Sequence, residues 1–288
     1  MKKNFYYLSL MLGLVFGMMM FTACGGDDDG DTGNGGSSGG GETGFVPGKF
    51  QGPKRVFGDN LLSSFGHEVG SRHELTYNSE NFVSKVKRGS YSSNGTVSSS
   101  IEYEVSYSDK QVNITRNGEH YMSITIGSNG FAQTIDDGKE IVTFEYDSEG
   151  HVTRFTTNRG YIGTLTWQNG NMIKPSDNDA GLNSTRTISY NSTSNVAGLY
   201  VRASIGGDVG DFYNEMLYYM GLLGKGTTNL IESYSYNRSD NSSSRTSVNT
   251  WTLDAAGRAI KCVTVTEETN SSGGSSSSST SSYIWNYR

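Results

Sequence analysis

The stretch Ser100-Ile101-Glu102-Tyr103-Glu104-Val105-Ser106-Tyr107 alternates strictly between polar and apolar side chains. Successive side chains of a β-strand point to opposite faces, so the four apolar residues share one face and the serines and glutamates share the other. A period of two is the pattern of a strand that is buried on one side and solvated on the other. The stretch therefore predicts a half-buried strand of an antiparallel sheet.

The same alternation returns along most of the chain. It recurs at residues 122–126, 142–146, 199–205 and 283–287. Compact turn signals separate such runs: Asn117-Gly118, Asn129-Gly130, Asp137-Gly138, Asn169-Gly170 and Ala256-Gly257. Closely spaced strands joined by short turns form hairpins rather than parallel crossovers. The sequence therefore predicts an all-β fold, an antiparallel up-and-down meander.

An irregular repeat ends several of these runs with an apolar residue followed by Asp or Asn. In Phe144-Glu145-Tyr146-Asp147 it is followed by Gly150 and then by Val152. The other copies are Leu75-Thr76-Tyr77-Asn78, Ile188-Ser189-Tyr190-Asn191 and Trp251-Thr252-Leu253-Asp254. We expect an inward side chain to end each strand, an Asx side chain to start the turn, and a residue that tolerates positive φ to precede the return strand. The second and fourth copies along the chain resemble the YD repeats of Rhs-type proteins.

The N-terminus has the pattern of a secretion signal. Lys2 and Lys3 precede an apolar run over residues 5–21, which is too short and too early for a spanning helix. The pair Ala23-Cys24 resembles the lipobox of bacterial lipoproteins, which implies cleavage before Cys24 and acylation, for example with palmitate, of that residue. We therefore expect a signal peptide at 1–23, a lipidated and flexible Gly/Asp/Ser tether at 24–44, and one antiparallel β-domain at 45–288.

Acidic residues follow Cys24 closely. Asp27, Asp28 and Asp29 resemble the export signal that sends Bacteroidetes lipoproteins to the outer face of the outer membrane. A solvated tether is the simpler alternative, since blocks of like charge repel one another and stay disordered. An EF-hand calcium loop is rejected, because Thr32 stands where the turn glycine is required and Ser38 where the bidentate glutamate is required.

Together, the lipobox, the acidic tether and the YD-like hairpins resemble a family of Bacteroidetes lipoproteins described as having a porin-like fold. This resemblance implies an open or half-closed barrel, a location at the outer membrane facing the cell exterior, and contact with the membrane through the N-terminal lipid. It brings no catalytic residues. Most outward positions are Ser, Thr, Asn and Glu and do not form an apolar band. We therefore expect a barrel-shaped domain whose outer surface faces water, not a barrel inserted in the membrane.

Residues 211–223 break the β pattern. They contain no β-branched run, have Asp208 and Asp211 as possible N-caps, and end among glycines. Their apolar stripe at helical spacing covers more than half the circumference, so we expect a short buried helix that plugs the concave face of the sheet. A mobile lid and a helix that dips into the membrane are the alternatives.

The last quarter of the chain predicts two further hairpins. We expect strands near 228–238, 245–254, 258–268 and 282–287. The polar loops 239–244 and 270–281 then lie at the same end of the meander, where they form a possible contact rim.

Few residues suggest chemistry. The formal net charge of −6 argues against nucleic acid, which requires a basic patch. His67-Glu68 begins like a zinc motif, but Ser71 stands where the second His is required. Cys262 lies within a predicted strand and is expected to be a small, partly buried hydrophobe. We expect no catalytic residues, no metal and no cofactor, and a hydrolase is only the second alternative function.

The favoured hypothesis is a non-catalytic binding module for a glycan or a peptide at the cell surface. Trp167, Trp251 and Trp285 are the candidate aromatics for stacking on a ligand in this acidic, hydroxyl-rich domain. Cross-strand packing also uses many aromatic residues, so these residues need not bind a ligand. The first alternative is a structural role, as an adhesin or an accessory subunit of an envelope complex.

Overall fold

The computed structural model describes residues 60–177, 184–199, 211–238, 243–270 and 275–288. All of them belong to the compact unit Phe45–Arg288. The predicted lipidation site Cys24, the acidic residues Asp27 to Asp29 and the possible N-cap Asp208 lie outside the described residues.

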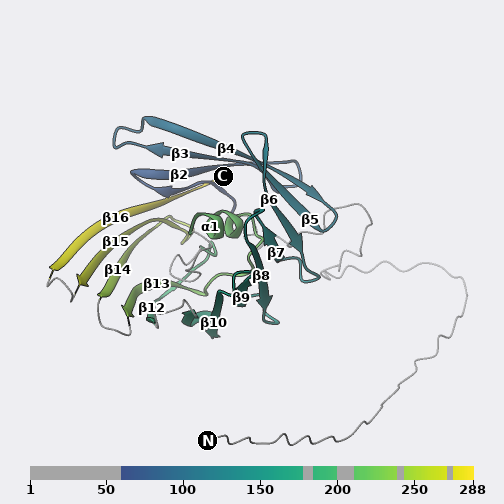
Figure 1. Cartoon of the computed structure of the whole chain (residues 1–288). Helices are drawn as coiled ribbons and strands as arrows, with labels where there is room; N and C mark the ends of the chain where they lie inside the picture. The colour runs from purple at the N-terminus through teal and green to yellow at the C-terminus, as the bar shows by residue number, and fades with distance from the viewer. Residues whose placement is uncertain (1–59, 178–183, 200–210, 239–242, 271–274) are drawn as a thin grey trace, which may run out of the picture. The chain divides into compact units, whose positions relative to one another are not determined.

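The described residues form sixteen strands and one short helix (Figure 1). The strands of the first part are β1 (Leu62–His67), β2 (Gly70–Tyr77), β3 (Val83–Tyr91), β4 (Val97–Ser108), β5 (Gln111–Arg116), β6 (Glu119–Ile126), β7 (Ala132–Asp136), β8 (Ile141–Tyr146), β9 (Val152–Thr157), β10 (Ile162–Gln168) and β11 (Asn171–Asp177). The second part comprises β12 (Ser184–Ser194), α1 (Asp211–Tyr219), β13 (Asn229–Arg238), β14 (Ser243–Leu253), β15 (Ala259–Asn270) and β16 (Ser275–Tyr287).

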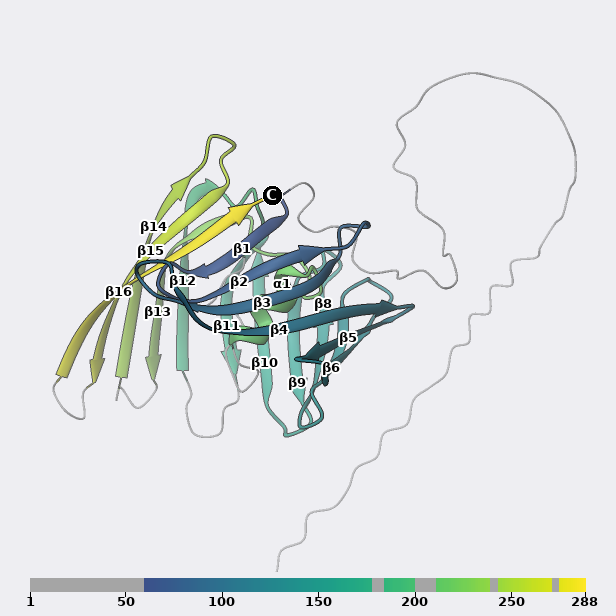
Figure 2. The ribbon, with the colours of Figure 1, turned by 90° about the horizontal axis from the view of Figure 1, so that it is seen from above.

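All sixteen strands belong to one antiparallel sheet that curls around α1 (Figure 2). Each strand pairs with the next one in sequence except at β11 and β12, and the first strand also pairs with the last, Phe65 opposite Trp285. The two edge strands of the sheet are β11 and β12, which lie side by side without a ladder of hydrogen bonds among the described residues. The predicted all-β meander is confirmed, and it forms a barrel that is closed except for this seam.

One end of the seam is held by side chains. The Asn171 amide donates to Asn229 Oδ1 at 2.9 Å, and the Asn229 backbone N–H donates to Asn171 Oδ1 at 3.0 Å. The Thr228 N–H donates to the Gly170 carbonyl at 2.9 Å. These bonds join the β10–β11 turn to the start of β13 and so close the barrel wall at that end.

A recurring five-residue turn joins many of the hairpins. At Asp147 the backbone N–H donates to the His151 carbonyl, the Gly150 N–H donates back to the Asp147 carbonyl, and Oδ1 accepts from the N–H groups of Glu149 and His151. Gly150 has a φ of 92°, a conformation that glycine adopts without steric cost. Asn78 and Asp254 start turns with the same bonds, so the predicted Asx turns after Tyr77, Tyr146 and Leu253 are confirmed.

The predicted Asx bond forms at Asn191, where the Thr193 N–H donates to Asn191 Oδ1 at 3.0 Å, but the predicted chain reversal there is wrong. Strand β12 continues to Ser194, with register shifts after Ser189 and after Tyr190, and the turn is made by Asn195 instead. The Gly198 N–H donates to the Asn195 carbonyl, and the Leu199 N–H donates to Asn195 Oδ1 at 2.7 Å. Strand β12 bulges after Tyr190 and pairs with β13 again at Ser194, opposite Asn229, so the chain does not reverse at the local turn signal.

Aromatic side chains form a hydrogen-bonded collar around one end of the barrel. In seven strand pairs, an aromatic residue near the end of an even-numbered strand donates from its O–H or indole N–H to a carbonyl near the start of the preceding strand. The pairs are Tyr77 to Leu62, Tyr107 to Val83, Tyr146 to Ala132, Trp167 to Val152, Tyr190 to Met172, Trp251 to Ile231 and Tyr287 to Ala259, all at 2.7 or 2.8 Å. The Tyr190 bond crosses the seam, so the collar spans the one place where the ladder is interrupted.

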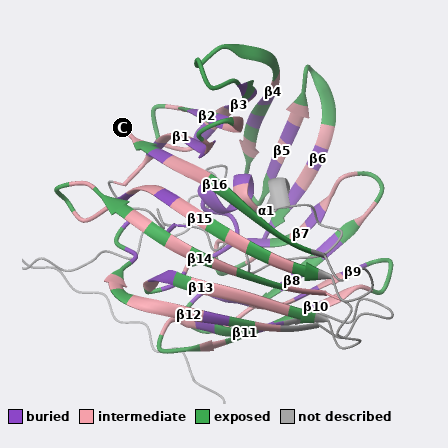
Figure 3. Ribbon diagram, turned by 90° about the vertical axis from the view of Figure 1, so that its left-hand side faces the viewer, coloured by how far each residue is buried: buried purple, intermediate pink, exposed green. Residues whose placement is uncertain are grey.

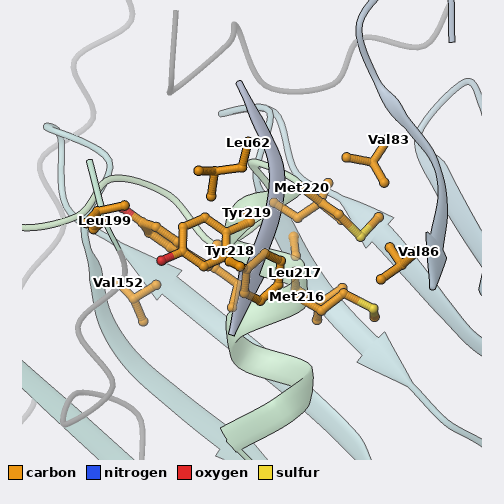
Figure 4. Packing of buried hydrophobic residues seen from close by; sticks show 14 of the residues in the cluster. Leu62, Val83, Val86, Val152, Leu199, Met216, Leu217, Tyr218, Tyr219 and Met220 are labelled. Carbon is orange, nitrogen blue, oxygen red and sulfur yellow. The ribbon is translucent and has the colours of Figure 1, made fainter. Parts of the chain in front are cut away.

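The helix α1 fills the centre of the barrel at the collar end. Met216, Leu217 and Tyr219 point into the core (Figure 4), where the first two are fully buried. The Tyr219 ring lies against Phe65 of β1, tilted by 48°, with ring centroids 4.4 Å apart. The helix ends at Tyr219 rather than at the predicted residue 223, because Gly221 adopts a φ of 79° and closes a Schellman motif. In this motif the Gly221 N–H donates to the Tyr218 carbonyl, and the Leu222 N–H donates to the Leu217 carbonyl. The predicted buried plug is confirmed.

The serine-rich run is not the loop that the sequence predicts. Residues 275–281 belong to β16 and pair with β15, for example Ser279 with Thr266. Serine has little preference for strands, but the long β15 hairpin partner offers a continuous ladder that satisfies its backbone groups. Residues 271–274 lie outside the described part of the chain.

Candidate binding cavity

The two parts of the barrel wall are filled differently. The core cluster combines apolar residues of β1–β11 with those of α1, and buried residues, drawn purple in Figure 3, recur along these strands. The inner faces of β12–β16 carry mainly polar side chains above an aromatic base. They enclose a cavity of about 410 Å³, which continues into a mouth compartment of about 340 Å³ through the shared residues Arg186, Tyr234 and Arg245.

A row of charged and aromatic side chains crosses the mouth compartment. The strand register places Tyr236 opposite Arg186 and Arg245, and it places Arg245 opposite Glu268. The Arg186 guanidinium lies 5.7 Å from the centroid of the Tyr236 ring, and Arg245 donates to Glu268 at 2.8 Å. The mouth thus offers a fixed donor and a fixed acceptor side by side.

The middle of the cavity is lined by hydroxyl and amide groups. Ser247 and Thr266 are cross-strand partners whose hydroxyls lie 2.9 Å apart. Two residues further in, the Thr264 hydroxyl donates to Asn249 Oδ1 at 2.8 Å, and the Asn249 amide lies 3.3 Å from the Ile231 carbonyl. These bonds fix the rotamers of neutral groups that both donate and accept hydrogen bonds.

Aromatic rings form the base of the cavity. Trp251 and Trp285 stack at 5.7 Å with an interplanar angle of 25°, and Tyr283 tilts against Trp285 at 4.8 Å. The base is anchored to α1, since the Trp285 indole N–H donates to the Tyr219 hydroxyl at 2.8 Å and the Tyr283 hydroxyl donates to the Glu215 carboxylate. The rings are therefore held rigidly before any ligand arrives.

The three tryptophans predicted as stacking residues do not form one platform. Trp251 and Trp285 meet at the base of the cavity, where Trp285 is only 5% exposed and Trp251 is partly exposed. Trp167 lies on β10, where its ring stacks on His151 at 4.3 Å and its indole N–H belongs to the collar. Of the three, only the first two line the cavity.

The sequence gives no strong sign of the other cavity residues. Arg245, Ser247, Asn249 and Trp251 stand at every second position of β14 and therefore share one face, but polar residues at such positions usually face water. Only the folded barrel, in which all four line the cavity, shows that these residues point inward. That period-two row is the signal that could have located the cavity wall.

Cys262 lines the base but is unsuited to nucleophilic chemistry. Its side chain is buried, and burial raises the pKa of the thiol to about 11 while a hydrogen bond with Thr264 lowers it slightly. A thiol with this pKa carries almost no thiolate at neutral pH. The prediction that Cys262 is a small buried residue is confirmed.

The described residues contain neither a metal-ligand cluster nor a membrane-spanning helix. In those ranges no group of three or more His, Cys, Asp and Glu side chains could hold a metal ion. The same ranges hold no helix with the length and apolar character that crossing a bilayer requires.

The chain matches a family model over residues 75–261, which include most of the barrel wall. That family, DUF4595, is described as a domain of unknown function with a porin-like fold. The chain belongs to this family. The predicted resemblance to a porin-like family is thereby confirmed, and DUF4595 is defined by its fold rather than by an enzymatic activity.

Two solved structures show the same fold as this DUF4595 chain. One is a porin-like protein from Bacteroides uniformis ATCC 8492, with a TM-score of 0.64 and 16% identity over 79% of this chain and 96% of that one. Another is a porin-like protein from Bacteroides vulgatus ATCC 8482, with a TM-score of 0.50 and 15% identity over 80% of this chain and 99% of that one. No curated protein matches the chain.

Proposed function

We propose that the barrel is a non-catalytic binding module for a neutral glycan and that a lipid on Cys24 holds it at the outer face of the outer membrane. The observation that carries the proposal is the cavity within β12–β16, which combines an aromatic base with hydroxyl and amide walls. Aromatic faces stack on the apolar face of a sugar ring, and pre-positioned Ser, Thr and Asn groups match its hydroxyls.

The charges of the cavity favour a neutral ligand. Its lining contains two guanidinium groups, Arg186 and Arg245, and two carboxylates, Glu215 and Glu268 across the two compartments. Arg245 is already paired with Glu268, and Glu215 accepts from Tyr283. A net charge near zero gives no electrostatic preference for an anion or a cation.

The walls favour a glycan over an extended peptide. A peptide that binds as an added strand needs an open sheet edge, where its backbone can pair. The cavity walls are instead the inner faces of strands, and β13, β14, β15 and β16 are each paired on both sides. Only side chains meet a ligand there, which suits a ligand rich in hydroxyl groups.

The positions of the carboxylates support a non-catalytic role. Glycoside hydrolysis requires two carboxyl groups roughly 5 to 10 Å apart. Glu268 lies at the mouth, whereas Glu215 bonds to Tyr283, which faces Cys262 on the neighbouring strand. Glu268 and Cys262 are six positions apart on β15, which corresponds to roughly 20 Å of strand. The two carboxylates are thus held by partners at opposite ends of the cavity wall, which argues against their acting as such a pair.

The anchor and export signal are tested on the whole chain. Cys24→Ala is expected to release the protein from the membrane fraction. Replacing Asp27, Asp28 and Asp29 together with Ala is expected to leave it anchored but protected from protease added outside the cell. If the triple variant is digested as fast as the wild-type protein, the export proposal is wrong.

Ligand binding is tested by screening the Cys24→Ala protein against an array of neutral, acidic and basic glycans. Asn249→Ala, which removes an amide from the cavity wall, is expected to weaken binding about tenfold, the value of one or two hydrogen bonds. Thr250→Ala is the matched control, because Thr250 is the next residue on β14 and its side chain is exposed on the outer face. Preference for acidic glycans, or equal loss in both variants, would contradict the proposal.

A further inference from the structure

We propose that the cavity takes the end of a glycan chain and not an internal segment of it. This inference rests on the proposed function and adds the manner of recognition: one terminal unit enters end-on and reaches the aromatic base. It follows from the depth of the cavity, from the closure of its inner end and from the order of the groups along its walls.

The inner end of the cavity is closed by packed side chains. Trp285, Leu199, Leu230 and Ile231 all line the base, and each is less than a tenth exposed. Trp285 is bonded to the buried residue Tyr219 at the end of α1. The collar bond from Trp251 to the Ile231 carbonyl joins β14 to β13. Within the described residues, a chain that enters from the mouth therefore meets a wall at the base.

The cavity is long for its volume. The mouth residue Arg245 and the base residue Trp251 are six positions apart on β14, so the wall extends for roughly 20 Å. The inner compartment of about 410 Å³ falls in the usual size range of pockets for one small ligand. An internal segment would have to enter, reverse and leave beside itself, which requires room for two chains.

The groups along the wall fit successive positions of one entering chain. The base presents the partly exposed ring of Trp251, which can stack on the terminal unit. Asn249, Thr264, Ser247 and Thr266 follow toward the mouth and can bond its hydroxyls. Glu268 lines the mouth compartment and not the inner one, so it reaches only units farther from the chain end.

Chain-end recognition is measured with long and short fractions of the same polysaccharide. Amylose, dextran and xylan are each immobilised at equal mass, and the amount of purified Cys24→Ala protein bound at saturation is recorded. For a polysaccharide that is bound, the amount is expected to rise in proportion to the number of chain ends. Equal binding per unit mass for long and short fractions would overturn the end-on inference but leave the proposed function standing. Retention by none of the three would remove both.

A second arm uses oligosaccharides of the polysaccharide that is bound. Glu268→Gln is expected to weaken binding of the hexasaccharide more than binding of the disaccharide, because only the longer chain reaches the mouth. Asn249→Ala is expected to weaken both equally, and Thr250→Ala neither. Melting curves of all three variants are recorded to check that each one is folded. A larger effect of Glu268→Gln on the disaccharide would overturn the order of the groups proposed here.

Discussion

The collar predicts a measurable loss of stability when a single hydroxyl is removed. In Tyr146→Phe the ring remains, but the hydrogen bond of 2.8 Å to the Ala132 carbonyl is lost. Ala132 is fully buried, so its carbonyl is left without this donor in a site closed to water. Losing one partner of a buried pair costs about 1–3 kcal/mol, and we expect a loss of about 2 kcal/mol in the free energy of unfolding.

This loss corresponds to a fall in Tm of about 4–8 °C for a domain of this size. The assay is urea unfolding and calorimetry of the Cys24→Ala protein with and without Tyr146→Phe. Tyr287→Phe, on another strand pair of the collar, is expected to cost a similar amount, and the double variant should show the sum because the two sites share no partner.

Tyr236→Phe is the control, since this half-buried tyrosine lies at the cavity mouth outside the collar and should change the free energy of unfolding by less than about 0.5 kcal/mol. A Tyr146→Phe protein that unfolds at the wild-type urea concentration would refute the collar as a stabilising feature. Equal losses in Tyr146→Phe and Tyr236→Phe would do so as well.

Two further predictions concern titration. Burial, aided by the charges of Arg88 and His67, lowers the pKa of His73 from 6.5 to about 3, so the unfolded chain binds a proton that the folded one excludes between these pH values. The free energy of unfolding should fall as the pH falls from 6.5, by about 3 kcal/mol at pH 4. His73→Phe should remove this part of the pH dependence, measured by urea unfolding at each pH. An unchanged pH dependence would contradict the burial argument. The second prediction follows from the thiol pKa of about 11 at Cys262: in the Cys24→Ala protein it should react with iodoacetamide about two orders of magnitude more slowly than free cysteine at pH 7.5, and rapid labelling of the folded protein would refute it.

The sequence predicts the strands and most of the turns because their signals are local. The alternation at 100–107 lies within β4, and Asp147 and Gly150 shape their own turn through side-chain and backbone bonds. The buried helix is equally local, since its apolar stripe and its terminal glycine act within a few residues. Such elements need no knowledge of distant neighbours.

Other features depend on distant residues and could not be predicted. Asn191 and Asn195 carry similar turn signals, and pairing of β12 with β13 selects Asn195. The serines of β16 form a strand only because β15 lies beside them. Nothing in the local sequence marks the seam after β11, and the cavity exists because Arg245, Ser247 and Asn249 point inward where the other half of the barrel has apolar residues.

The pairing of β1 with β16 separates the order of the strands in space from their order in the chain. The barrel consists of two runs of sequential hairpins, β1–β11 and β12–β16, joined by contacts between the two ends of the domain. Such distant contacts slow folding, because a long loop must close before they form. A circular permutant that links Arg288 to β1 and opens between β11 and β12 would make every pair of strands consecutive. The natural order instead leaves β1 without its second partner until β16 has been synthesised.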